Sequence, residues 1–98
     1  MNFNFPDLEE LVGGYFHQDW KEDASTAAGV LERYLSEWPI ESVSKTLDEL
    51  IALLQENDER LASTVMSMGS YYNPVGDGLT YREWLNQIAA RLTKHLAL

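Results

Sequence analysis

Apolar residues recur along the chain at intervals of three and four, the spacing of one face of a helix. The first such stripe comprises Leu8, Leu11, Val12, Tyr15 and Phe16. Pro6 lies just before it and suits the first turn of a helix, where its missing N–H costs nothing. Gly13 and Gly14 interrupt this pattern, since each glycine costs about 1 kcal/mol in a helix interior. We therefore predict a first helix with two glycines that allow close packing of another backbone.

A second and a third stripe predict two more helices around Pro39. The second helix is expected to begin near Asp23 or Ser25, both suitable N-caps, and to end before Pro39. Its inward residues would be Ala27, Leu31, Tyr34, Leu35 and Trp38. Residues 17–23 lack periodicity and are expected to form a connection. The third helix is predicted over about 41–55, and its inward residues would be Val43, Leu47, Leu50, Ile51 and Leu54.

The last part of the chain predicts two helices separated by a loop. A short helix over about 59–68 would turn Leu61, Val65 and Met68 inward and end at Gly69. Residues 69–79 contain strong turn signals and are expected to form a loop. Thr80 and Glu83 have the spacing of a capping box that opens the final, most regular helix. No segment alternates as a strand does, so we predict an all-α fold: residues 1–98 as one domain, an irregular bundle of about five helices.

Charge adds information about the partner. The chain carries 16 Asp+Glu and 7 Lys+Arg, a net charge of −9. Residues 1–49 hold eleven acids and three bases, a net of −8, whereas residues 50–98 hold five acids and four bases, a net of −1. Such a chain repels nucleic acid and anionic lipid and favours basic partners. A surface adapted only for solubility has the same composition, so this second interpretation stays open.

Secretion and membrane insertion are not expected. The absence of cysteine excludes disulfides, a Cys-based zinc site and a thiol nucleophile. No stretch of about 18 apolar residues is present, and residues 1–5 lack the basic start and apolar run of a signal peptide. The absence of cysteine also fits a cytoplasmic location.

Catalysis is not expected either. His17 and His95 do not have the spacing of a metal motif such as H-E-x-x-H, and no GxSxG, P-loop or GxGxxG motif occurs. The acids could supply a catalytic carboxylate pair, but nothing singles one out. We therefore predict no metal, no cofactor and no enzyme activity. His17 is expected to cap or pack between elements, or to contact a partner.

The aromatic residues divide between core and surface. Tyr34 and Trp84 lie on apolar stripes, and core packing is also expected for Trp20, although it stands beside acids. Tyr71 and Tyr72 lie in the predicted loop, where core packing and partner contact are equally plausible, because loop tyrosines are common anchors in interfaces.

Three segments in this order carry a family resemblance: FPDLEELVGGYFHQDW at residues 5–20, YLSEW at 34–38 and YYNPVGDGLTYREWL at 71–85. The chain resembles the small α-helical immunity proteins of bacterial contact-dependent growth inhibition systems, from Phe5 to about Leu92. Its signature segment is YFHQDW at residues 15–20.

The resemblance implies a partner and a location. The partner would be a toxin, the C-terminal domain of a large secreted surface protein that is delivered into neighbouring cells. Toxins paired with this helical type resemble ribonucleases, some with an RNase A-like domain. The immunity protein would reside in the cytoplasm, bind as a monomer in a 1:1 complex and cover the active site. A ribonuclease must present a basic cleft to phosphates, which an acidic first half would complement.

Exposed acids near the loops are the predicted toxin contacts. The candidate site residues are Asp19, Glu22, Asp23 and Asp77, with Tyr72 as a candidate aromatic anchor. The second-rank candidates are Glu9, Glu10 and Glu37. Inhibition would then be steric and electrostatic, with carboxylates placed where the phosphates of the substrate would sit.

Two rival functions share parts of this pattern. A helical adaptor or regulatory module that binds another basic protein would have the same charge and fold, and growth rescue against a neighbouring toxin would distinguish it. A small enzyme would need a pocket with coupled, perturbed carboxylates. Inhibition of a nuclease at one-to-one stoichiometry would exclude that enzyme.

Overall fold

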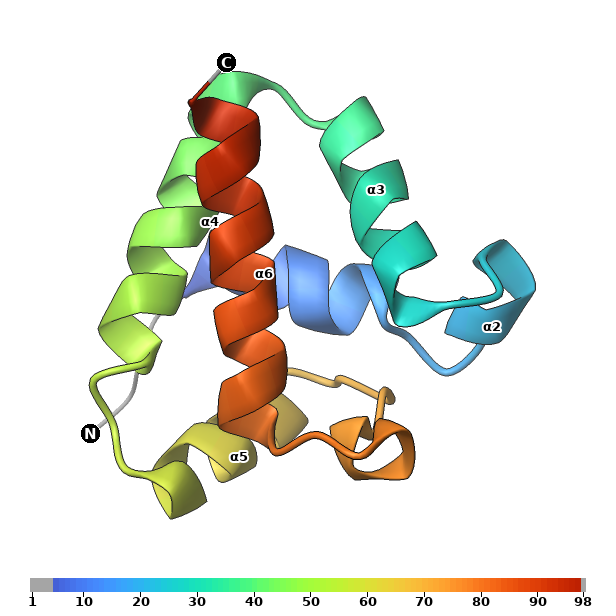
Figure 1. The fold of residues 1–98 in the computed structure, drawn as a ribbon, viewed down its shortest axis with the longest axis vertical. Coiled ribbons are helices and arrows are strands. Elements are labelled where there is room, and N and C mark those ends of the chain that lie inside the picture. The colour runs from blue at the N-terminus through green and yellow to red at the C-terminus, as the bar shows by residue number, and fades with distance from the viewer. Residues whose placement is uncertain (1–4, 98) are drawn as a thin grey trace.

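The computed structural model describes residues 5–97, which form helices joined by short loops, with no strand among them (Figure 1). Residues 1–4 and 98 lie outside this part, as does most of the segment assessed for a signal peptide. The predicted all-α fold of about five helices is confirmed. Over the described residues, every helix falls short of the length and hydrophobicity of a membrane span.

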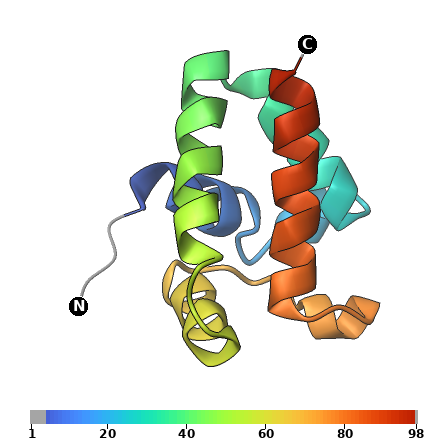
Figure 2. The same ribbon diagram turned by 60° about the vertical axis from the view of Figure 1, so that its left-hand side comes forward.

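The helices follow the chain in a simple order. The elements are α1 (Pro6–Glu9), the π-helix η1 (Glu10–Tyr15), α2 (Trp20–Asp23), α3 (Ala27–Glu37), α4 (Ile40–Leu53), α5 (Asp58–Ser67), the 3-10 turn η2 (Pro74–Asp77) and α6 (Tyr81–Leu96). Helices α4 and α6 run side by side in opposite directions, and α1–η1 crosses behind them (Figures 1 and 2). Helix α3 packs on η1, and α5 packs at the lower end of α6.

Side-chain caps mark the starts of α3, α5 and α6. Thr80 and Glu83 form the predicted capping box at the start of α6. The N-cap of α3 is Thr26, whose hydroxyl accepts the N–H of Gly29 at 3.0 Å, so the prediction of Asp23 or Ser25 was wrong. Residues 17–23 are not only a connection either, because α2 occupies their second half.

One hydrophobic core lies between the helices. It includes Leu8, Leu11, Val12, Phe16, Trp20, Val30, Leu31, Tyr34, Leu35, Val43, Leu50, Leu53, Leu61, Val65, Tyr72, Trp84, Leu85, Ile88 and Leu92. Most of the predicted inward residues are among them. In α4, however, Leu53 is buried and the predicted Ile51 is 48% exposed. Thr46 is the buried polar residue of this core, and its hydroxyl lies 2.8 Å from the hydroxyl of Tyr34.

Two polar contacts join helix ends that are distant in sequence. The backbone N–H of Leu8, near the start of α1, donates to Oε1 of Glu49 on α4 at 3.0 Å. At the start of α6, Arg82 donates to the carbonyl oxygens of Leu54 and Glu56, at and just beyond the end of α4. Backbone groups that a helix end leaves without partners are satisfied in this way. These bonds therefore connect α4 to α1 and to α6.

Gly13 is the point where two backbones approach most closely. A Cβ added at Gly13 would overlap the carbonyl oxygen of Met68, just after α5. Directly beyond this contact, the N–H of Tyr71 donates to the carbonyl oxygen of Phe16 at 2.8 Å. The prediction that the glycines allow close backbone packing is confirmed for Gly13. At Gly14 the nearest neighbour is instead the flexible side chain of Glu10, 3.2 Å from an added Cβ.

We predict that Gly13→Ala lowers the free energy of unfolding by about 2–3 kcal/mol, because the methyl group would have to displace a backbone carbonyl. The matched control, Gly14→Ala, should change it by less than about 1 kcal/mol, since only a carboxylate tip must move and alanine favours the helix. Urea unfolding followed by circular dichroism measures both. Equal stability of the two variants would show that the Gly13 contact does not limit the packing.

Candidate functional site

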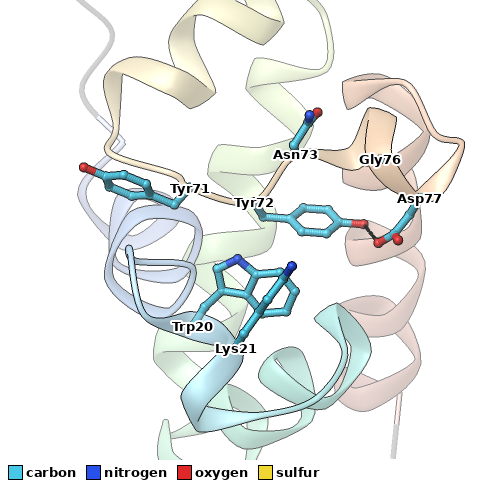
Figure 3. A pocket seen from close by; sticks show the side chains of 7 residues that line it. All are labelled: Trp20, Lys21, Tyr71, Tyr72, Asn73, Gly76 and Asp77. Atoms are coloured by element: carbon cyan, nitrogen blue, oxygen red, sulfur yellow. Dashed lines mark hydrogen bonds between the residues drawn. The ribbon is translucent and has the colours of Figure 1, made fainter.

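The predicted site residues lie on two segments that face each other. Asp19, Glu22 and Asp23 belong to α2 and the residue before it, whereas Tyr72 and Asp77 belong to the loop that follows α5. A hollow of about 260 Å³ lies between the two segments (Figure 3). Its lining residues are Trp20, Lys21, Tyr71, Tyr72, Asn73, Gly76 and Asp77. The structure therefore brings together two segments that are about 50 positions apart in sequence, and of the predicted site residues Tyr72 and Asp77 line the hollow between them.

A cluster of four aromatic rings holds these segments in place. Phe16 packs edge-on against Trp84 with ring centroids 5.1 Å apart, and Tyr72 packs on Trp84 at 4.7 Å. Trp20 meets Tyr72 edge-on at 5.5 Å. Such pairs stabilise a fold by about 0.5–1.5 kcal/mol beyond the area that they bury. Burial of Trp20, as expected from the sequence, thus explains how one turn of helix is fixed beside the loop.

The structure corrects the expectation for Tyr72. Its side chain is only 4% exposed, so its ring is part of the core and is not free to anchor a partner. Its hydroxyl donates to Oδ2 of Asp77 at 2.6 Å, and burial together with this carboxylate raises the pKa of Tyr72 well above its usual value. The exposed aromatic residue of the loop is instead its neighbour Tyr71, at 62%. Sequence alone did not distinguish these two tyrosines.

The exposed acids of the site differ in their partners. Asp19, Glu22 and Asp77 are exposed and form no ion pair within residues 5–97. Asp23 lies 2.8 Å from Nε2 of His17 and 3.3 Å from the guanidinium of Arg33. The hydrogen bond from His17, followed by the charge of Arg33, lowers the pKa of Asp23. Of the four first-rank acids, Asp23 is therefore the one that has a cationic partner within residues 5–97.

His17 forms two hydrogen bonds to the α2 segment. Its Nδ1 accepts the backbone N–H of Asp19 at 3.0 Å, which leaves Nε2 to donate to Asp23. Of the roles expected for His17, contact between elements is the one that these bonds support, since the residue lies between η1 and α2. Among the described residues, no group of three or more His, Asp or Glu side chains could hold a metal ion.

A second, polar hollow of about 250 Å³ continues this acidic surface. It is lined by Glu10, Gly14, Tyr15, His17, Asp23, Arg33 and Glu37. Glu10 and Glu37 were second-rank candidates, and the structure places them around the same hollow as Asp23. The sequence did not predict this grouping, because it depends on how η1 packs against α3.

Tyr15 links the wall of this second hollow to the core. Its hydroxyl donates to Oε1 of Glu37 at 2.5 Å and accepts the indole N–H of Trp38 at 2.7 Å. Burial, and then the hydrogen bond to Glu37, raises the pKa of Tyr15 to about 12. The same hydrogen bond lowers the pKa of Glu37, so this carboxylate stays charged on the surface.

We predict that stability falls between pH 10 and pH 12 and that Tyr15 causes part of the fall. An unfolded tyrosine ionises near pH 10, whereas folded Tyr15 keeps its proton to about 12, so its contribution is complete below pH 10 and lost as the pH rises through 12. In Tyr15→Phe the fall should be shallower, by at most about 1.4 kcal/mol per pH unit. Urea unfolding at several pH values measures this difference, and parallel curves for the two proteins would refute it.

Comparison with known proteins agrees with the resemblance noted in the sequence. A family model described as "CdiI immunity protein" matches residues 4–92, which is most of the chain. Searches of curated proteins and of solved structures found no match. The chain belongs to the CdiI immunity protein family, which protects against toxins of contact-dependent growth inhibition systems.

Proposed function

We propose that this protein neutralises a ribonuclease toxin domain by covering its basic active site with the acidic surface formed by α2, the 71–77 loop and the hollow beside η1. The observation that carries the proposal is the set of exposed carboxylates on α2 and the residue before it, of which Asp19 and Glu22 have no ion-pair partner within residues 5–97. Carboxylates without internal partners are available to the cations of another protein.

Charge complementarity supports this assignment to a basic partner. A ribonuclease must attract phosphates, and the same field attracts carboxylates that occupy their place. Opposite potentials raise the association rate constant to about 10⁸–10⁹ M⁻¹s⁻¹ at low salt. Fast capture matters for a protein that must bind a toxin before the toxin finds RNA. The acidic half of the chain, with a net charge of −8 over residues 1–49, suits that requirement.

The protein would act in the cytoplasm as a monomer, by binding alone and without catalysis. An interface of about 1,600 Å² is the usual size for a stable, specific complex. The described part of the chain has an accessible surface of 5786 Å². Its share of such an interface, about 800 Å² per partner, leaves most of that surface free. A 1:1 complex is therefore compatible with this size.

The direct test uses a toxin domain encoded immediately upstream of this chain. Co-expression with the present protein should restore growth of cells that produce the toxin. In vitro, ribonuclease activity should fall to background at one equivalent of the protein. Restored growth without any nuclease activity in the toxin would overturn the ribonuclease assignment and leave immunity intact. Absence of both effects would favour a helical adaptor for another basic protein.

We predict that charge reversal on α2 slows toxin binding. Glu22→Lys combined with Asp23→Lys should weaken affinity, but Asp23 also holds His17 and Arg33. Asp19→Lys combined with Glu22→Lys is the cleaner variant, and its association rate constant should fall about tenfold at low salt.

The matched control is Glu41→Lys combined with Asp48→Lys on α4, which changes the net charge by the same amount away from the site. Surface plasmon resonance at two salt concentrations measures both pairs, and the difference should shrink at high salt. Equal rates for the α2 and α4 variants would show that the location of the charge does not matter.

A further inference from the structure

The hollow between α2 and the 71–77 loop combines aromatic surface with a carboxylate. Trp20 lies on its α2 side, the ring of Tyr72 crosses it, and Asp77 closes one end (Figure 3). A flat, cationic side chain fits such a setting, because a guanidinium can lie against an aromatic ring and donate hydrogen bonds to a carboxylate at the same time.

The molecule already places a cation in this hollow. The ammonium group of Lys21 lies over the ring of Trp20, 5.6 Å from its centroid (Figure 3). Lys21 is exposed and forms no ion pair within the described residues. Its flexible side chain can therefore move away at little cost when a better-matched cation arrives.

The carboxylate of Asp77 is oriented in advance for binding a cation. The hydroxyl of Tyr72 donates to Oδ2 and holds the carboxylate in one orientation. Oδ1 accepts no hydrogen bond from residues 5–97, so it is available to a donor from another molecule. The backbone of Asp77 belongs to the 3-10 turn η2, which fixes its position. A carboxylate that is oriented in advance loses little conformational entropy when it binds.

We propose that this hollow receives one arginine side chain of the toxin, which replaces Lys21 over Trp20 and donates to Oδ1 of Asp77. The inference rests on the proposed function only in assigning that arginine to the toxin. Asp19 and Glu22 flank Trp20 and Lys21, the two residues of the α2 segment that line the hollow. This contact would be central to the interface, since arginine in an aromatic-lined pocket is a frequent hot spot.

A small probe tests the hollow without any toxin. Titration with N-acetyl-arginine amide, followed by NMR, should give saturable shifts of the Trp20 indole N–H and the backbone amides of residues 71–77. Asp77→Asn keeps an oxygen that accepts from Tyr72 but removes the charge, and it should weaken the probe at least fivefold. Lys21→Met should strengthen it. Scattered shifts, an unchanged affinity in Asp77→Asn or tighter binding of N-acetyl-lysine amide would each overturn the proposal.

The second arm uses the toxin domain. Asp77→Asn should raise the dissociation constant at least tenfold, mainly through faster dissociation, whereas Asp48→Asn on α4 should leave it unchanged. A double-mutant cycle with each toxin arginine should find one that couples to Asp77. If the unmodified protein inhibits the toxin and Asp77→Asn binds equally well, the arginine contact is refuted while immunity stands. If the unmodified protein fails to inhibit, the proposed function is refuted, and the probe titration still decides whether the hollow binds arginine.

Discussion

The contact of Gly13 with the carbonyl oxygen of Met68 sets the arrangement of the whole site. Only a residue without a side chain lets the N-terminal helix cross the chain after α5 at this distance. The crossing brings the carbonyl oxygen of Phe16 to the N–H of Tyr71. Two segments that are far apart in sequence are thereby aligned side by side, and α2 and the loop extend from them in a fixed relation.

Packing of the aromatic rings holds the two aligned segments together. Phe16, Tyr72 and Trp84 meet directly behind the crossing, and Trp20 joins them from the next turn. Helix α2 is four residues long, too short to be stable by itself in water. Burial of Trp20 therefore supplies the stability that the short helix lacks, and it holds α2 beside the 71–77 loop. Rigid support of this kind reduces the entropy that binding would otherwise cost.

Sequence reasoning predicted what local periodicity and capping determine. The five main helices, the Thr80 capping box and most inward residues follow from such rules. On α4 it predicted Ile51 to be buried, whereas the buried residue is Leu53. Helix α4 packs against both α1 and α6, and one apolar stripe does not describe a helix that is covered on two sides. It also missed α2 and did not decide between core packing and partner contact for Tyr72. Both depend on the tertiary aromatic cluster, which has no local signal.

An acid at the site is available to a partner only where no cation of the fold already pairs with it. Arg33 lies close to Asp23 and Glu37, and Arg91 pairs with Glu32 at 2.6 Å, so three of the acids in the first half have an arginine partner within the fold. Asp19 and Glu22 have no ion-pair partner within residues 5–97. They flank Trp20 and Lys21, and Lys21 is the only cation among the residues that line the hollow. The total of 16 Asp+Glu therefore overstates the number of carboxylates that are available for binding. A few carboxylates fixed in position by buried rings have the greater effect, because a partner's cations gain most from charges that need not reorganise.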